Sequence, residues 1–485
     1  MAIQANTQMP SDLGPRIGML VAGLVFVLLM LFGLLMRASQ GGLLEIDPAL
    51  FYQLMTAHGI GMVGASGYAG ACIMWYFMRQ YVPVTNAIFW GITVLFLIGV
   101  VLILAAIFLM GAAPAWTFLY PLMAQSGGVW DATAALVYLI GLLLVGVAFL
   151  VFYLDVGWAT IKAYGGLGRA MGWPQLFGGG GGEAPPPAVV AGTVVTVVNT
   201  IALVPGASII LISIVNVLVP SFGIDALLAK NMIYFFGHVF INAAIYMTII
   251  AVYEIVPQYT GRPWKSSRIF LAAWFATLFM VMAVYPHHLF QDIVMPPWML
   301  VMGQVLSYLS GFPILFVTTI GLLSNLYGAK VRWDLPLALL TLGVFGWAAG
   351  VIPAVLDGII SINNVMHNTM WVPGHFHFYL LLGLVAMVFG FMLWLTRSRQ
   401  SSSLSGLANI LLWLYVVGGL GVVGTFLFAG SASVPRRWAV HLEAWQGTGV
   451  IATLFAVLAV LGALYFLIRY IAGIGGKPTT TEAAE

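Results

Sequence analysis

The chain has 485 residues, of which 62% are hydrophobic and only 6% are charged, and its formal net charge is +3. This composition excludes an ordinary soluble globular protein, and the sparse positive charge excludes a nucleic-acid-binding surface. The single cysteine, Cys72, excludes an internal disulfide and a metal centre with two cysteine ligands from this chain.

Twelve hydrophobic segments follow one another along the chain, each long enough to cross roughly 30 Å of hydrocarbon at about 1.5 Å per residue. The first follows a short polar head without a small-residue cleavage site, so we expect a retained helix and not a signal peptide. The sequence predicts an all-α polytopic membrane protein whose residues 1–485 form a single domain. The segments are 15–37, 48–78, 84–113, 131–153, 187–219, 226–257, 266–295, 297–325, 335–361, 372–396, 404–430 and 445–470.

Two polar stretches interrupt or follow these segments. The connector 155–187 contains Gly178–Gly182 followed by Pro185–Pro187, so we expect a flexible and then a stiff link. The polar tail after Lys477 is expected to be mobile. Because segments on both sides of the connector carry candidate ligands, the connector does not divide the chain into domains.

The distribution of lysine and arginine predicts the orientation in the membrane. If the N-terminus lies inside, the inner segments hold 13 of the 17 positive residues. Positive residues concentrate on the cytoplasmic side, so we expect both termini in the cytoplasm of a prokaryotic cell, with the chain in its inner membrane. The four outer positive residues are Arg37, Lys230, Arg436 and Arg437.

Seven of the eight histidines fall in the outer third of the bilayer on this topology. An imidazole in hydrocarbon is costly unless something binds it, so such a residue is by default a candidate functional group. One histidine alone could be a satisfied core residue, but several at one depth favour a metal site. The seven are His58, His238, His287, His288, His367, His375 and His377.

Spacing divides these histidines into groups. His375 and His377 are about 200° apart around a helix, so one helix could serve two flat cofactors on opposite faces. The adjacent pair His287–His288 could reach one metal only if the helix end is irregular, and Pro286 precedes it. Together with His238, this pair supplies three imidazoles, which suit copper, iron or zinc.

Five segments of the chain resemble the catalytic subunit of the heme–copper oxidase superfamily, and the B-type branch most of all. The resemblance extends from the second to the eleventh predicted helix and implies a heme–copper oxidase-type bundle of about twelve helices. The segments are MTAHG (55–59), FFGHVF (235–240), YPHHLF (285–290), HNTMWVPGHFHF (367–378) and VPRRW (434–438).

The resemblance implies two hemes and one further metal. His58 and His377 would be the axial ligands of a low-spin heme, expected to be of b type, and His375 the proximal ligand of a high-spin heme. The further metal, copper or non-heme iron, would be held by His238, His287 and His288. The heme propionates would contact Arg436, Arg437 and His367. The alternative for the two arginines is that their side chains only extend to the membrane surface.

Position 242 departs from the oxygen-reducing members of the superfamily. Their A and B branches have a tyrosine there, cross-linked to the histidine one turn before, whereas this chain has Asn242; the tyrosine position of the C branch is Val281. Members that reduce nitric oxide lack this tyrosine, so the sequence favours nitric oxide reduction to nitrous oxide. Oxygen reduction with cytochrome c or quinol, with or without proton pumping, is the alternative, and Tyr285 is its candidate donor. A purely packing role is the other interpretation of Asn242.

A polar line partly matches the proton channel of the B branch. Glu254 would be its inner entry, although a surface glutamate at the headgroups is an equal alternative. The candidate path consists of Tyr253, Glu254, Gln304 and Ser307.

The chain lacks a CxxCH heme attachment, so electrons would come from a second subunit on the outer face that receives them from cytochrome c, a cupredoxin or quinol. The other expected partners are the lipid bilayer and a small gaseous substrate. A polytopic transporter that moves protons or metals through histidines is the second class of function.

Overall fold

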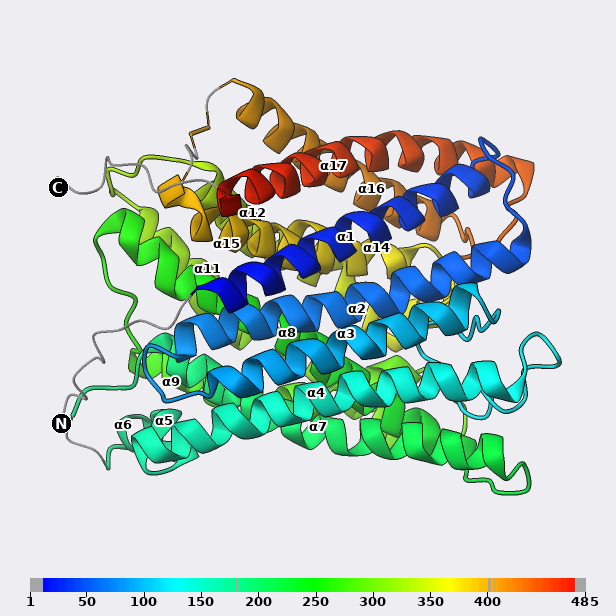
Figure 1. Cartoon of the computed structure of the whole chain (residues 1–485), viewed down its shortest axis with the longest axis horizontal. Helices are drawn as coiled ribbons and strands as arrows, with labels where there is room; N and C mark the ends of the chain where they lie inside the picture. Colours follow the sequence, from blue (N-terminus) through cyan, green and yellow to red (C-terminus); the bar gives the residue numbers. More distant parts are fainter. Residues whose placement is uncertain (1–11, 180–181, 400–402, 405, 476–485) are drawn as a thin grey trace.

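The computed structural model describes residues 12–179, 182–399, 403–404 and 406–475 (Figure 1). The tail expected to be mobile after Lys477 lies outside these residues. Within them, twelve helical segments are long and apolar enough to cross a membrane, which confirms the predicted all-α polytopic fold. The chain is an integral membrane protein.

Nine of the spans are single helices and three are composite. The single helices are α1 (Leu13–Gln40), α2 (Pro48–Met78), α3 (Asn86–Phe108), α4 (Ala132–Tyr164), α7 (Pro187–Leu218), α8 (Ala226–Thr260), α12 (Leu335–Asp357), α16 (Leu407–Ser431) and α17 (Glu443–Gly475). The composite spans are α9 (Arg268–Ala283) with η1 (Tyr285–Leu289), α10 (Pro297–Leu309) with α11 (Phe312–Leu326), and α14 (Trp371–His377) with η2 (Phe378–Val385) and α15 (Ala386–Leu395). Shorter helices are α5 (Leu167–Ala170), α6 (Trp173–Phe177), α13 (Ile360–Met366) and η3 (Arg397–Arg399).

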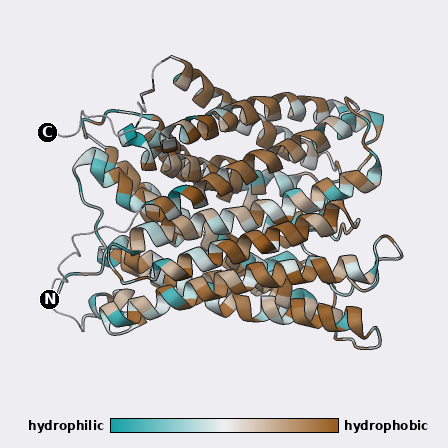
Figure 2. Cartoon of the chain, in the orientation of Figure 1, coloured by the Kyte–Doolittle hydropathy of each residue, from teal (hydrophilic) through white to brown (hydrophobic). Residues whose placement is uncertain are grey.

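The spans lie side by side in one bundle, and α1 begins at the same end at which α17 finishes, as an even number of crossings requires (Figure 1). Neighbours in sequence pack against one another, as in the pairs α3 with α4, α7 with α8, and α16 with α17. Hydrophobic residues cover the middle of the bundle, and hydrophilic residues gather toward its two ends (Figure 2). This distribution is typical of proteins that span a lipid bilayer.

Several spans begin with a side chain that accepts a hydrogen bond from the first turn. Asp47 accepts from Ala49 N and Asp131 from Ala134 N, both at 2.8 Å. Such caps satisfy amide groups that have no partner within the helix. At the other end of α4, Gly165 has φ +72°, a left-handed conformation that glycine adopts without strain.

The fourth span is longer than the sequence predicted. We expected it to end at residue 153 and a connector to begin at 155, but α4 continues to Tyr164 and α5 and α6 follow. The last turns carry polar residues that bond at the end of the bundle: the Asp155 carboxylate accepts from Thr85 N at 2.9 Å, and the Lys162 ammonium lies over the Trp158 ring. The hydrophobic pattern therefore ended before the helix did.

Two spans are irregular where they carry histidines. The pair His287–His288 lies in the 3-10 segment η1, which confirms the expected irregular helix end. The tenth span changes from α-helix to the π-helix η2 directly after His377. Insertions of this kind occur often at functional sites, because they turn side chains relative to the rest of the helix.

Gly430 allows α16 to approach the start of α14, since a Cβ atom there would overlap the backbone of Trp371. We predict that Gly430→Ala lowers the free energy of unfolding by about 1–3 kcal/mol, because the backbone must shift to make room. Thermal unfolding of the detergent-solubilised protein measures the effect. Gly424→Ala on the same helix is the control: its Cβ would meet nothing within 4 Å, so it should not destabilise. Equal losses in both variants would contradict the prediction.

Candidate functional site

A cavity of about 390 Å³ in the interior of the bundle is lined by all seven histidines that the sequence singled out. The eighth, His441, is buried elsewhere and does not line it. The two spans most fully enclosed by the rest of the protein, α8 and the composite span Trp371–Leu395, each contribute histidines to its wall. The predicted histidines therefore meet in one place.

His58 on α2 and His377 on α14 face one another across part of this cavity. Their ring centres are 6.1 Å apart and their planes differ by only 13°. Each Nδ1 lies 2.7 Å from a backbone carbonyl, that of Leu29 for His58 and that of Pro373 for His377. An Nδ1–H that donates to a carbonyl leaves Nε2 with its lone pair free for a metal.

The separation of these rings fits a shared metal. Two imidazole nitrogens bound to one ion at about 2.0 Å each require ring centres roughly 6 Å apart. Near-parallel planes on opposite sides are suited to a flat group between them. The pair therefore fits the heme that the sequence expected there.

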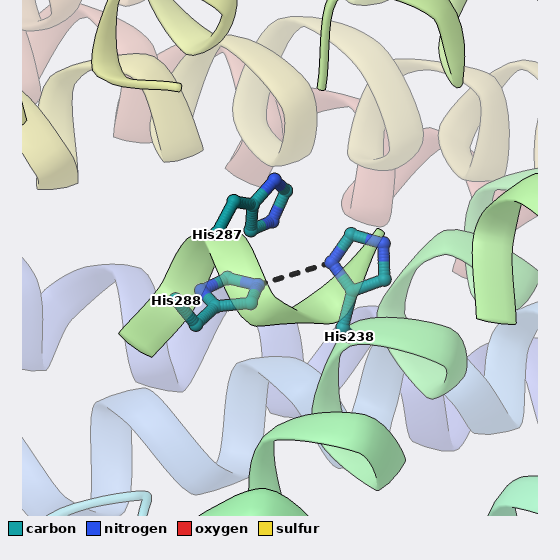
Figure 3. A group of neighbouring side chains, drawn as sticks. All are labelled: His238, His287 and His288. Atoms are coloured by element: carbon teal, nitrogen blue, oxygen red, sulfur yellow. Dashed lines mark hydrogen bonds between the residues drawn. The ribbon is translucent and has the colours of Figure 1, made fainter. Parts of the chain in front are cut away.

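The second group is the cluster of His238, His287 and His288, which project toward one another from α8 and η1 (Figure 3). One ring nitrogen from each lies within 4.8 Å of the others, and His238 Nδ1 is 3.0 Å from His288 Nε2. Nitrogens that bind the same ion at about 2.0 Å lie roughly 3 Å apart, so these two already have the spacing of co-ligands.

Ser307 on α10 orients the third ring. Its hydroxyl donates to the carbonyl of Gly303 at 2.7 Å and lies 2.7 Å from His287 Nδ1. Since the hydroxyl hydrogen is used, Ser307 Oγ accepts from His287 Nδ1–H, and Nε2 of His287 is the nitrogen left for a metal. All three rings thus fit copper or iron.

His375 lies two residues before His377 and belongs to a different part of the cavity wall. Its Nδ1 is 3.9 Å from a carboxylate oxygen of Asp357 and has no hydrogen-bond partner among the described residues. A spacing of two residues puts the two side chains roughly 200° apart around a helix, so separate cofactors for His375 and His377 stay a prediction.

The predicted arginine pair reaches the cavity because backbone bonds hold residues 434–436 against the start of the tenth span. Met370 N donates to Val434 O at 2.8 Å, and Arg436 N donates to Asn368 O at 3.1 Å. Burial, together with the neighbouring Arg437, lowers the pKa of the Arg436 guanidinium to about 10. The same two arginines add to burial in lowering the pKa of His367 to about 4, so this ring is neutral at pH 7.

Positive charge exceeds negative charge around the cavity. The described residues that line it include three arginines, Arg37, Arg436 and Arg437, against one carboxylate, that of Asp357. Arg37 is buried and contacts the Met370 sulfur and the Phe426 ring. This surplus fits an anionic group such as a heme propionate, which would complete the charge balance.

Two residues expected beside the metals have other partners. The Asn242 side-chain amide donates to the carbonyl of His238 in its own helix at 2.8 Å and lies 3.4 Å from the His238 ring. It therefore touches a candidate ligand and makes no bond to another helix among the described residues. Tyr285 does not line the cavity: its hydroxyl donates to Asn231 Oδ1 at 2.9 Å.

The residues expected to conduct protons form separate groups. Tyr253 and Thr318 share a 2.7 Å hydrogen bond, and Tyr81 donates to the Glu254 carboxylate. Gln304 accepts from the backbone of Ile360 at 2.8 Å. Across the described residues no direct hydrogen bond joins these groups to Ser307, so the path stays a prediction.

Sequence reasoning missed several residues of the site. Tyr234 and Trp116 line the cavity, and Tyr234 could have been noticed because it lies one turn before His238 on the same helix face. Arg37 was counted only as an outer charge. Asp357 and Thr318 have no local signal, since their partners are distant in sequence.

The fold and the cavity define a membrane protein with two histidine sites of metal-binding geometry inside its apolar bundle. Residues 16–464 match the family described as "Cytochrome C and Quinol oxidase polypeptide I", and the chain belongs to this family, whose members form heme–copper oxidase subunit I. The family implies hemes and a metal at a histidine site.

Relatives agree with this assignment. The chain is 24% identical over 289 residues to "Cytochrome c oxidase subunit 1" of Thermus thermophilus, a match that covers 54% of this chain and 51% of the relative. It is 25% identical over 461 residues to "Cytochrome c oxidase polypeptide 1" of Halobacterium salinarum, covering 90% of this chain and 73% of the relative. The first match thus spans about half the length of the relative.

A solved structure has the same fold. The cryo-EM structure of a heme-copper terminal oxidase dimer superposes with a TM-score of 0.81 at 20% identity, covering 96% of this chain and 84% of that chain. At this identity the likeness concerns the arrangement of helices.

We predict that Ser307→Ala lowers the affinity of the three-histidine cluster for its metal about 10–100-fold, because His287 loses the acceptor that orients its ring. Metal content per chain after dialysis against graded chelator concentrations measures the effect. Ser310→Ala, one turn further along the same span, is the control and should retain metal as the parent does. Unchanged metal retention in Ser307→Ala would contradict the role assigned to this serine.

Proposed function

We propose that this chain is the catalytic subunit of a respiratory terminal reductase and works as one catalytic unit with two hemes and one further metal. His58 and His377 would hold the low-spin heme and His375 the high-spin heme. When bound, the hemes would carry electrons and bind the gaseous substrate beside the further metal. That metal would be copper or iron, held by His238, His287 and His288.

The observation that carries this proposal is the meeting of two different histidine sites in one cavity. One is an opposed pair whose rings are 6.1 Å apart, and the other is a cluster whose nitrogens lie within 4.8 Å. His58, His377 and His287 each have a partner that orients the ring and leaves one nitrogen free for a metal. A transporter would not need a three-imidazole cluster beside an opposed pair.

We propose dioxygen, reduced to water, as the substrate, where the sequence alone favoured nitric oxide. Three relatives that match this chain are named cytochrome c oxidase, which supports oxygen chemistry. The presence of a tyrosine, Tyr234, in the cavity wall supports the same choice. Cleaving the O–O bond requires four electrons, so an oxidisable side chain nearby is an advantage.

Nitric oxide reduction is the second candidate, and Asn242 is the observation that favours it. Its amide lies 3.4 Å from the His238 ring. The oxygen-reducing A and B branches have a tyrosine at this position, and it is the B branch that the sequence motifs resemble. Joining two nitric oxide molecules needs only two electrons and two protons, so that reaction needs no side-chain donor.

The two substrates are separated by measuring oxygen consumption and anaerobic nitric oxide consumption in one preparation. We predict oxygen turnover at least tenfold faster than nitric oxide turnover, a difference of about 1.4 kcal/mol in activation free energy. Faster nitric oxide turnover would establish the second candidate instead.

The ligand assignment is tested by removing one ring at a time. His58→Ala or His377→Ala should abolish the low-spin absorption while the high-spin heme remains, because each ring fills one axial position. His441→Ala is the matched control, since this ring does not line the cavity. Optical spectra of the reduced membranes measure both signals, and normal low-spin spectra in either variant would overturn the assignment.

Electrons would enter from the outer side of a prokaryotic inner membrane, with both termini in the cytoplasm. A second subunit would deliver them from cytochrome c, a cupredoxin or quinol, because the sequence has no CxxCH motif and only one cysteine. We predict that removing every other subunit lowers turnover with a soluble donor by at least tenfold while the heme spectra persist. Full turnover by the isolated chain would exclude such a partner.

A further inference from the structure

We propose that the Asp357 carboxylate positions His375, the candidate ligand of the high-spin heme, by accepting a hydrogen bond from its Nδ1–H. The inference rests on the proposed function, which assigns that heme to His375, and it adds a positioning residue to the site. Asp357 is the last residue of α12 and His375 lies on α14, two helices that pack against each other. Both side chains line the cavity.

His375 is the one candidate heme ligand whose second ring nitrogen has no partner among the described residues. Nδ1 of His58 and Nδ1 of His377 each lie 2.7 Å from a backbone carbonyl. Nδ1 of His375 is buried and forms no hydrogen bond to any described residue. Histidines that bind a metal almost always donate the other N–H to a carboxylate, a carbonyl or water. His375 therefore needs an acceptor that its own helix does not supply.

The Asp357 carboxylate is oriented so that one oxygen remains for His375. The side-chain amide of Asn363 donates to the Asp357 carbonyl at 2.9 Å and to Oδ1 at 3.2 Å. The other oxygen, Oδ2, lies 3.9 Å from Nδ1 of His375 and accepts no hydrogen bond from another described residue. A donor without an acceptor thus faces an acceptor without a donor.

The position of Asp357 is not explained by the helix that carries it. A carboxylate at the C-terminal end of a helix lies beside the negative end of the helix dipole, and the apolar bundle adds a desolvation cost. The Arg436 guanidinium interacts electrostatically with Asp357. Within the described part of the chain, however, the carboxylate forms no ion pair with an arginine. Oδ2 therefore still requires a donor, and His375 is the one that faces it.

Closing the contact requires only a small movement of side chains. An N–H···O hydrogen bond spans about 2.9 Å between its heavy atoms, so the observed separation of 3.9 Å is longer by about 1 Å. Rotation about the side-chain bonds of Asp357 and His375 covers that difference without a shift of the backbone. The two helices are already joined nearby, since Trp371 Nε1 of α14 donates to Pro353 O of α12 at 3.2 Å.

A carboxylate partner changes the ligand more than a backbone carbonyl does. It accepts a stronger hydrogen bond and leaves Nε2 more basic. A more basic ligand stabilises oxidised iron over reduced iron and so lowers the reduction potential of a heme bound there. The partners would thus give the two hemes ligands of different strength, with carbonyls at His58 and His377 and a carboxylate at His375.

The test is Asp357→Asn in the complete complex, which keeps the shape of the side chain and removes its charge. Resonance Raman spectra of the reduced protein give the iron–histidine stretching band of the high-spin heme. We expect this band to move to lower frequency, because a weaker acceptor leaves Nε2 of His375 less basic. The reduction potential of the same heme should rise, and the absorption of the low-spin heme should not change.

The matched control is Asp292→Asn. That carboxylate pairs with Lys230 at 2.6 Å and does not line the cavity, so its loss should leave the band and the potential as in the parent. An iron–histidine band in Asp357→Asn at the frequency of the parent overturns the inference. A carboxylate that served only Arg436 would give that result.

Two further variants measure retention of the high-spin heme. Asp357→Ala should bind this heme about 10–100-fold less tightly than the parent, whereas Asp357→Glu, which keeps the charge, should retain it. Equal retention in the alanine variant and the parent, or loss of the heme from the glutamate variant, overturns the inference. A parent complex that contains no high-spin heme would refute the proposed function itself, and the role of Asp357 would fall with it.

Discussion

Imidazole rings in an apolar bundle must have partners, and the architecture of this protein follows from that constraint. Moving a polar group from water into an apolar interior costs several kcal/mol if the group gains no hydrogen bond there. The backbone carbonyls of Leu29 and Pro373 accept hydrogen bonds from Nδ1 of His58 and His377, and the Ser307 hydroxyl oxygen accepts one from Nδ1 of His287. These contacts satisfy one nitrogen of each ring and direct the other into the cavity, so the same bonds that make burial tolerable also prepare the rings for metal.

Helix irregularity and close helix contacts position these partners. The 3-10 segment η1 lets two adjacent histidines contribute to one cluster, and the π-helix η2 follows the residue that opposes His58. Gly430 lets α16 lie directly on the backbone at the start of α14. Because α14 carries His375 and His377, an error of an ångström there would move both candidate heme sites. Packing in the bundle and the chemistry of the cavity are therefore coupled.

Hydrophobicity and spacing predicted most of the architecture from the sequence, because membrane spans and histidine pairs are local signals. All twelve spans and the meeting of the seven histidines were predictable in this way. The extension of α4 to Tyr164 was not, since its last turns depend on polar contacts such as that of Asp155 with Thr85. Tyr234 and Asp357 were also missed, because their relation to His288 and His375 arises only when separate helices pack together.

The central claim is that the cavity holds two hemes, and the heme content of the purified chain tests it most directly. Pyridine hemochrome spectra, referred to protein concentration, give the number of hemes per chain without assuming a substrate or an electron donor. The account predicts two hemes per chain. A well-folded preparation that contains no heme would contradict it and would favour a transporter that uses its buried histidines in another way.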